Sequence, residues 1–508
     1  MTEGMVRRGH GIADLADEYD VIVVGAGPAG LSAATMLARF KARTLLVDEN
    51  QTPGGQIYRA ITLAQSADRR RLGEDYWRGR GIAEDFLNSE AEYAPATTAW
   101  SIQSVQDDAE RIVGQEVGLS STGMARLIRA KQVVLATGAL ERPFPIPGWT
   151  LPGVMTAGAA QIALKTSGLV PSGKVVIAGT GPLLYLLAAQ LIEAGARVST
   201  VLDTTPRENW LRAFRHAPGF LVSPYLAKGL KLLRTVQRRT RVIRWVSELA
   251  AEGEGGLREV VWRAGGCEHR LPADLLLLHQ GVVPNVNFSN AAGCAHEWDE
   301  AQLTFRPQID EWYGSSVAGL SLAGDGAGIR GAEAAAIQGR IAGLGCASRL
   351  GLVAPAERDR LAVPLRRSLA RAMRGRRFLD ELYRPGKEFR VPQDPDTIVC
   401  RCEEISAGQI RTSVSAGAGG PNQMKVFLRC GMGPCQGRLC GLTVTELIAD
   451  ERSKHPCEIG FYRLRFPIKP LRLRELAALP QTQTAKVAVL ADLADTHHSA
   501  DWNERKPQ

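Results

Sequence analysis

Four cysteines in the last quarter of the chain form two close pairs, spaced C-x-C and C-x₄-C. They are Cys400, Cys402, Cys435 and Cys440. Four thiolates in two pairs are what a [2Fe-2S] cluster needs. Zinc also takes four thiolates, but its sites more often use C-x₂₋₄-C, so the C-x-C pair favours the iron–sulfur cluster. The pattern therefore predicts a one-electron centre.

The remaining cysteines are not expected to bind metal. Cys430 lies five residues before Cys435, and we expect a buried neutral thiol there rather than a ligand. The others are scattered and are expected to be packing residues, because free cysteine is often buried: Cys267, Cys294, Cys346 and Cys457. The eight histidines show no metal-ligand spacing.

A glycine motif near the N-terminus has the pattern of a dinucleotide-binding turn. Gly25, Gly27 and Gly30 form G-x-G-x-x-G between an apolar strand and an Ala-rich helix. The first glycine permits the tight turn, the second lets the backbone approach a pyrophosphate, and the third allows close helix–strand packing. The helix that starts at Pro28 and Ala29 directs the positive end of its dipole at the phosphates.

Two carboxylates end the second strand of this unit. Asp48, 18 residues after Gly30, is placed to accept hydrogen bonds from a ribose, and Glu49 is its neighbour. A lone G-x-G-x-x-G is weak evidence, but the complete strand–helix–strand context favours nucleotide binding over a plain tight turn.

Three later segments indicate which nucleotide binds. They read "PGGQIYR", "LATGALERP" and "AGDG", and span residues 53–59, 135–143 and 323–326. In this order they resemble the FAD-binding set of the pyridine-nucleotide-disulfide reductase superfamily. The resemblance implies that Gly324 and Asp325 contact the FAD ribityl chain and pyrophosphate. It also implies that Gly55 and Gln56 lie near the flavin ring. The same FAD-binding set includes Thr137 and Gly138, the small-residue crossover at the end of the strand in the second segment.

The chain departs from those reductases at one point. They need a C-x-x-C beside the flavin, whereas no cysteine precedes Cys267 here. Thiol–disulfide exchange at a dithiol beside the flavin is therefore not expected.

A second glycine motif, about 150 residues downstream, is incomplete. Gly179 and Gly181 are followed by Leu184 where a third glycine or alanine would stand, and Asp203 ends the next strand. One interpretation is an NAD(H) site, since an acidic residue there favours a free 2′-hydroxyl. The other is a degenerate Rossmann domain kept for structure or subunit contact, because a bulky third residue hinders close helix packing.

The motifs together predict an α/β protein with two Rossmann-like domains, the second inserted in the first, and a small C-terminal helical [2Fe-2S] domain. We expect an FAD-binding domain over residues 19–165 and 281–350, and an NAD-binding-like domain over 166–280. We expect a flexible tail over 1–18, a linker over 351–395, the [2Fe-2S] domain over 396–455 and a C-terminal tail over 456–508.

Composition excludes several classes of protein. Nine cysteines in 508 residues do not suggest a disulfide scaffold. No signal peptide and no run of 18 apolar residues is visible, so the expected location is cytoplasmic. The net charge of +9 concentrates in Lys228–Arg244 and Arg366–Arg377, where solvated helix faces are favoured over an acidic partner or a membrane surface. No nucleic-acid module is present.

Four segments narrow the resemblance: residues 138–165, "GTGPLLYLLAAQL", "AGDGAGIRGAEAAAIQGRIAG" and "CGMGPCQGRLCG". In this order they resemble the larger flavoprotein subunit of hetero-oligomeric amine dehydrogenases. That group includes the A subunit of opine oxidase, the hydrogen cyanide synthase middle subunit and the alpha subunit of dye-linked proline dehydrogenases. The cysteine stretch resembles the [2Fe-2S] domain of bacterioferritin-associated ferredoxin.

That family implies a division of labour. A beta subunit that resembles D-amino-acid oxidase carries its own FAD and oxidises the substrate, and some members add a small ferredoxin-like gamma subunit. The family also implies FMN at a subunit interface, FAD or another adenine nucleotide in the first Rossmann site, and membrane association through partners in some cases. No catalytic acid–base or nucleophile set is evident in this chain. The competing functions are a stand-alone NAD(P)H-dependent ferredoxin-type reductase and a nucleotide-binding scaffold holding zinc.

Overall fold

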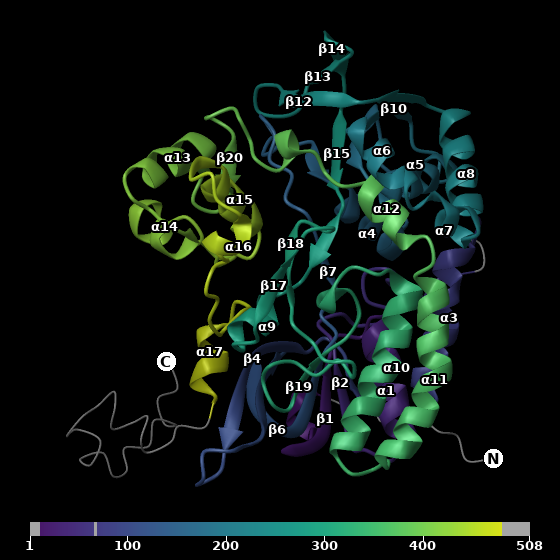
Figure 1. Ribbon diagram of the computed structural model, residues 1–508, viewed down its shortest axis with the longest axis vertical. Helices are drawn as coiled ribbons and strands as arrows, with labels where there is room; N and C mark the ends of the chain where they lie inside the picture. The colour runs from purple at the N-terminus through teal and green to yellow at the C-terminus, as the bar shows by residue number, and fades with distance from the viewer. Residues whose placement is uncertain (1–10, 66–68, 480–508) are drawn as a thin grey trace, which may run out of the picture.

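The structure is a computed structural model that describes residues 11–65 and 69–479. Figure 1 shows three bodies: a lower domain that begins at β1, an upper domain that ends in the ribbon β12–β14, and a small helical domain at the left. No described helix has both the length and the apolar character to cross a bilayer.

The lower domain is built on a seven-stranded sheet. Its parallel part, in the order β3-β2-β1-β6-β19, consists of apolar strands buried on both faces, as a covered parallel sheet requires. β5 and β4 extend it as antiparallel strands. The bounds are β1 Glu18–Val24, β2 Thr44–Val47, β3 Glu92–Ala94, β4 Thr98–Gln106, β5 Ile112–Ser121, β6 Met124–Leu135 and β19 Leu320–Leu322.

Helices α1 (Pro28–Arg39) and α10 (Ala332–Arg349) pack together over this sheet, with α2 (Arg69–Leu72) and α3 (Glu74–Leu87) beside them. Their contact is close because it is lined by glycine and alanine. A Cβ on Gly339 would lie 2.0 Å from the carbonyl oxygen of Ala29, so only glycine fits there.

The upper domain is inserted into the lower one, as predicted. A short antiparallel ribbon of β7 (Ala139–Glu141) and β16 (Val282–Pro284) carries the two connections. The parallel sheet has the order β11-β10-β9-β15-β8. Its bounds are β8 Val154–Thr156, β9 Val175–Thr180, β10 Val198–Asp203, β11 Arg241–Arg244 and β15 Leu275–Gln280. Because β8 is its edge strand, this unit begins ahead of the expected boundary at residue 166.

The rest of the upper domain covers that sheet. Its elements are α4 (Ala157–Ser167), α5 (Pro182–Glu193), α6 (Glu208–Phe214), α7 (Ala217–Leu221), α8 (Pro224–Gln237), and the antiparallel ribbon β12 (Val246–Glu252), β13 (Glu259–Ala264) and β14 (Cys267–Pro272). Between the domains lie α9 (Asn287–Ala291) and the hairpin β17 (His296–Asp299) and β18 (Thr304–Pro307).

The small domain has its own core of buried apolar residues. It consists of β20 (Ile398–Cys400), β21 (Ile405–Ser406), α13 (Ala407–Ser415), α14 (Pro421–Leu428), α15 (Gly441–Glu451) and α16 (Pro456–Ile459). In Figure 1, β20 and α15 face the other two domains, and α14 lies on the outer side.

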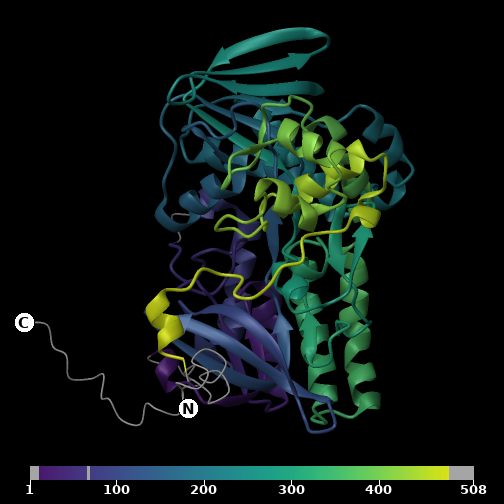
Figure 2. The same ribbon diagram turned by 90° about the vertical axis from the view of Figure 1, so that its left-hand side faces the viewer.

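The connecting segments are more ordered than the sequence suggested. The expected linker contains α11 (Pro355–Ala372), which packs on α10, and α12 (Arg376–Leu382), which packs on α6. After the small domain the chain returns along the lower domain (Figure 2) and ends its described part in α17 (Leu473–Ala477). There the amide of Ile468 donates to the carbonyl of Trp100 at 3.0 Å. The parts of the expected tails over 1–10 and 480–508 lie outside the described residues.

Candidate iron–sulfur and nucleotide sites

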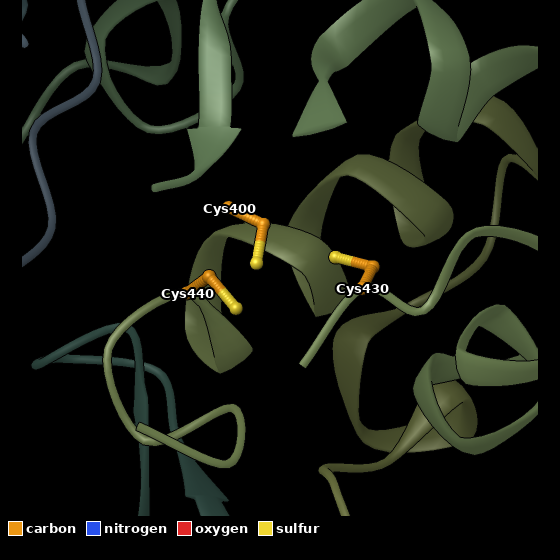
Figure 3. A group of neighbouring side chains, drawn as sticks. All are labelled: Cys400, Cys430 and Cys440. Carbon is orange, nitrogen blue, oxygen red and sulfur yellow. The ribbon is translucent and has the colours of Figure 1, made fainter. Parts of the chain in front are cut away.

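Three buried cysteines meet in the small domain (Figure 3). Cys400 ends β20, Cys440 precedes the first residue of α15, and Cys430 follows α14. Their sulfur atoms all lie within 4.8 Å of one another. A strand end, a helix start and a loop thus bring together residues that lie up to 40 positions apart in the chain.

The other two predicted ligands lie outside this group and are more exposed. Cys402 is exposed and Cys435 is half-buried. Cys435 is close enough to Cys440 and Cys402 for both to act on its pKa, but neither Cys402 nor Cys435 belongs to the group whose sulfur atoms all lie within 4.8 Å of one another. The loop is tight there, since a Cβ on Gly433 would lie 2.3 Å from the Cβ of Cys402.

Hydrogen bonding among these thiols favours thiolate at two of them. Hydrogen bonds from Cys430, then from Cys440, lower the pKa of Cys400 to about 2. The hydrogen bond from Cys440 lowers the pKa of Cys435 to about 5 despite partial burial. The hydrogen bond with Cys400 raises the pKa of Cys430 to about 12, so Cys430 is neutral. A soft, sulfur-rich site with ready thiolates fits iron–sulfur or zinc chemistry.

Cys430 is buried and neutral, as expected, yet it lies as close to Cys400 and Cys440 as a ligand would. The sequence had indicated only that Cys430 lies five residues before Cys435 along the chain. Of the four scattered cysteines, Cys294 and Cys346 are buried, but Cys267 and Cys457 are exposed, and the packing prediction is wrong for those two. Cys267 opens the outermost strand of a three-stranded ribbon, and most side chains of that strand are exposed.

A buried ionic group joins the small domain to the domain junction. Glu446 on α15 forms ion pairs with Arg390 and with Arg142, whose Nη1 lies 3.7 Å from the carboxylate. Burial raises the pKa of Glu446 and lowers that of Arg142 to about 10, while the two guanidinium groups stabilise the carboxylate. The indole of Trp149 also donates to the carbonyl of Ile398 at 2.7 Å, two residues before Cys400.

The first glycine turn has the geometry of an anion site. Gly25 has φ +104°, and a Cβ there would lie 2.5 Å from the carbonyl oxygen of Ala136, while a Cβ on Gly30 would lie 1.8 Å from the oxygen of Gly25. Gly27 precedes α1, whose first residue is Pro28, and no described side chain caps the helix. The uncapped N-terminus leaves N–H groups available for phosphate, so the residues fit a dinucleotide.

The two carboxylates after β2 already have partners within the chain. Asp48 is buried and accepts from the amide of Ala26 at 2.5 Å and from Asn50 at 2.7 Å, so it braces the glycine turn. Burial raises the pKa of Asp48. Glu49 is exposed and forms an ion pair of 2.9 Å with Lys469. Ribose binding by Asp48 stays a prediction.

The "PGGQ" loop lies against the same turn. The amide of Gly54 donates to the carbonyl of Ala26 at 2.8 Å, and a Cβ on Gly55 would lie 2.7 Å from Cα of Gly27. The side chain of the next residue, Gln56, is exposed and accepts from Arg59 at 3.0 Å.

A buried lysine that sequence reasoning missed holds this loop to the upper domain. Lys165 on α4 donates to the carbonyl of Ile57 at 2.9 Å and to Gln161 at 3.0 Å. Gln161 donates to Gln190 on α5, which donates to the carbonyl of Leu72. Burial, and then the charge of Arg59, lower the pKa of Lys165 to about 7.

The remaining predicted FAD residues meet beside this turn. Thr137 donates to the carbonyl of Asn285 at 3.2 Å, and a Cβ on Gly326 would lie 3.2 Å from the Thr137 hydroxyl. The amide of Asn285 donates to the carbonyl of Gly138 at 3.0 Å. A Cβ on Gly324 would lie 2.7 Å from that of Ala29 on α1, so the crossover and the "AGDG" turn lie side by side.

Asp325 orders the turn that opens α10. One carboxylate oxygen accepts from the amides of Arg330 and Gly331 at 2.8 and 3.0 Å. The side chain is only half-buried, so it remains reachable for a ligand hydroxyl.

The second glycine turn is closed by the chain's own side chains. Asp203 is buried and accepts from the Tyr185 hydroxyl at 2.5 Å and from the amide of Thr205 at 2.9 Å. Thr180, between Gly179 and Gly181, makes a hydrogen bond of 2.7 Å with the Thr205 hydroxyl. The acidic residue expected to meet a ribose is thus engaged by protein groups, a feature that the glycine spacing alone could not reveal.

A further pair that the sequence did not indicate lies beside this turn. Nδ1 of His279, at the end of β15, is 2.7 Å from the carboxylate of Glu141, which also accepts from the amide of Gly158. The histidine is 2% exposed, so the pair is a buried structural contact at the domain ribbon.

Fold and sites define an oxidoreductase that joins a dinucleotide-binding unit to a sulfur-rich metal site. Residues 19–339 match the pyridine nucleotide-disulphide oxidoreductase family, and residues 398–450 match the BFD-like [2Fe-2S] binding domain. The chain is 50% identical to the A subunit of opine oxidase from Rhizobium meliloti over 94% of its own length and 90% of that protein. It is 34% identical to hydrogen cyanide synthase subunit HcnB of Pseudomonas aeruginosa over 89% and 96%.

The chain therefore belongs to the pyridine nucleotide-disulphide oxidoreductase family, in the group that contains the A subunit of opine oxidase. Among solved structures, L-proline dehydrogenase from P. horikoshii has the same fold, with a TM-score of 0.66 and 19% identity over 90% of this chain and 79% of that one.

Proposed function

We propose that this chain is the electron-transferring subunit of a hetero-oligomeric dehydrogenase that oxidises the C–N bond of an amino acid or opine. The observation that carries the proposal is the group of three buried cysteines within 4.8 Å of one another, in a chain that also holds a dinucleotide-binding turn. No cysteine precedes Cys267, so the thiols near a flavin that disulfide reduction needs are missing. The named relatives, which are subunits of opine oxidase and hydrogen cyanide synthase, support the assignment.

In this proposal the substrate site lies on a partner subunit that resembles D-amino-acid oxidase, and a small ferredoxin-like subunit completes some assemblies. FAD, or another adenine nucleotide, and a [2Fe-2S] cluster supply the redox chemistry when bound, with FMN at the subunit interface, and the electrons leave to an acceptor other than O₂. Four cysteines would hold the cluster: Cys400, Cys402, Cys435 and Cys440.

This chain's other residues serve to bind and orient. The start of α1 would receive the pyrophosphate, with Gly27 allowing close backbone approach. Asp325 would accept a ligand hydroxyl, and Gly55 and Gln56 would lie near the ring. The engaged carboxylate of Asp203 argues against NAD(H) in the second turn, because a ribose would have to displace Tyr185 or Thr205.

The competing function is a self-contained NAD(P)H-dependent reductase of a ferredoxin-type acceptor. One observation supports it: the upper domain has an intact parallel sheet with a glycine turn. Anaerobic addition of NADH to the purified chain separates the two functions. We expect no bleaching of bound flavin, whereas rapid bleaching would favour the reductase.

Native purification tests the proposal as a whole. We expect a co-purifying subunit that carries its own flavin, about two irons per copy of this chain and no stoichiometric zinc. A lone chain that oxidises an amino acid or opine with full activity would overturn the partner assignment.

A further inference from the structure

The predicted cysteine ligands of the [2Fe-2S] domain differ in exposure. We call the side with the buried ligands the buried pole and the side with the exposed ligands the exposed pole. Cys400 and Cys440 are 1% and 3% exposed, whereas Cys402 is exposed and Cys435 half-buried. The buried pole adjoins the segment that the indole of Trp149 anchors to the domain junction. The exposed pole is the place where a second protein can come close to the sulfur ligands.

Large apolar side chains are exposed on the helix and the loop that lead to Cys435 in the chain. Val426 is 84% exposed and Phe427 49% on the last turns of α14, which Figure 1 places on the outer side of the domain. Met432 and Leu439, 43% and 57% exposed, lie on the loop that carries Cys435. These four residues, which we call the cluster face, are large apolar side chains exposed within one stretch of the chain, residues 426–439. Exposed apolar groups mark interaction sites.

The segments that carry or adjoin the cysteine ligands are rich in basic side chains. Residues 401–404, 425–440 and 461–465 contain six cations and only two carboxylates, Glu403 and Glu404. The guanidinium of Arg438 is close enough to Cys435 and Cys402 for their charges to act on its pKa, and Lys425 is likewise close to Arg465 and Cys440. Within the described chain, Arg429 is the only one of the six that forms an ion pair, with Glu403 at 3.3 Å.

We propose that the cluster face is the docking surface for an acidic protein that carries a one-electron centre and accepts electrons from this chain. The proposal rests on the function proposed above. Exposed apolar side chains on a segment whose cations mostly form no ion pair suit a transient electron-transfer encounter, which buries little area and is guided by opposite charge. A permanent subunit would need a larger and more apolar surface.

The test uses the natively purified complex, reduced anaerobically with one equivalent of dithionite and mixed with an oxidised probe by stopped flow. The probes are rubredoxin, which is acidic, cytochrome c, which is basic, and the neutral acceptor benzoquinone. At low salt we expect rubredoxin to oxidise the cluster at least about tenfold faster than cytochrome c does, with a rate that falls as salt rises.

Two variants locate the surface. Val426→Glu places a carboxylate in the cluster face, and Val113→Glu makes the same change at a 54% exposed position on β5 of the lower domain. We expect Val426→Glu to slow rubredoxin about tenfold and to leave benzoquinone unchanged, whereas Val113→Glu changes neither rate.

Equal rates with rubredoxin and cytochrome c, or an unchanged rubredoxin rate in Val426→Glu, would overturn the proposal. So would a Val426→Glu complex that has lost its partner subunit or a second copy of this chain, because the cluster face would then be a permanent interface. Absorbance and paramagnetic resonance before mixing report the cluster itself. Without a [2Fe-2S] signal the proposed function fails, irrespective of docking.

Discussion

The buried carboxylate of Glu446 fixes the small domain to the rest of the molecule, and its removal should loosen that attachment. Its side chain is 2% exposed, and those of Arg142 and Arg390 are 4% and 15% exposed. Replacement by leucine leaves two guanidinium groups buried without their anion, which typically costs about 3–5 kcal/mol. Because Arg142 keeps hydrogen bonds to two backbone carbonyls, we expect the lower part of that range.

A loss of about 3 kcal/mol raises the population of the opened state roughly 100-fold. Limited proteolysis of the cluster-loaded chain measures that population when closing is faster than cleavage. We expect Glu446→Leu to be cut between the small domain and the lower domain about 100-fold faster than the unmodified chain. Loss of the cluster's absorbance should follow at the same rate.

Glu458→Gln is the matched control, because this carboxylate on the neighbouring α16 is 51% exposed and only 3.7 Å from Lys454. An exposed ion pair of this kind contributes at most about 1 kcal/mol to stability. The cleavage rate of Glu458→Gln should therefore exceed that of the unmodified chain by less than about fivefold. If Glu446→Leu were cut no faster than Glu458→Gln, the buried ionic group would not hold the domain, and the reasoning would be refuted.

Three further predictions concern the cysteine group, the buried lysine and the first glycine turn. Cys402→Ala should lower bound iron well below that of the unmodified chain, whereas Cys430→Ala should keep about two irons per chain; iron loss in Cys430→Ala alone would make Cys430 the ligand. The pKa of Lys165 is about 7 in the folded chain and 10.5 in the unfolded chain. Between these pH values the unfolded chain binds one more proton, so the free energy of unfolding rises by up to about 1.4 kcal/mol per pH unit. The urea midpoint of Lys165→Met should lack this rise with pH, and a profile parallel to that of the unmodified chain would contradict the prediction. Gly30→Ala should abolish flavin retention because its Cβ meets the oxygen of Gly25, whereas Gly81→Ala, with open space around its Cβ, should retain flavin fully.

Local patterns in the sequence predicted what depends on neighbours along the chain. The turn at Gly25–Gly30 and the strand–turn–helix around Asp325 follow from glycine positions and apolar runs, and both appear as predicted. The inserted second domain followed from the repetition of one motif. The expected linker proved helical, because the apolar side of α11 packs on α10, a partner that its Arg-rich composition did not indicate.

The sequence could not supply contacts between distant segments. The engagement of Asp203 by Tyr185 depends on how α5 lies over β10, and spacing alone made the aspartate look free. The closeness of Cys430 to Cys400 depends on the loop after α14. The Lys165 network crosses two domains, so no local motif announces it.

The most direct measurement mixes the native complex anaerobically with candidate amino acids and opines and records paramagnetic resonance at low temperature. We predict that an oxidisable substrate produces the signal of a reduced [2Fe-2S] cluster in the complex, and that the isolated chain gives none with the same substrate or with NADH. A reduced-cluster signal from the isolated chain with NADH alone would contradict the proposed electron-transferring role.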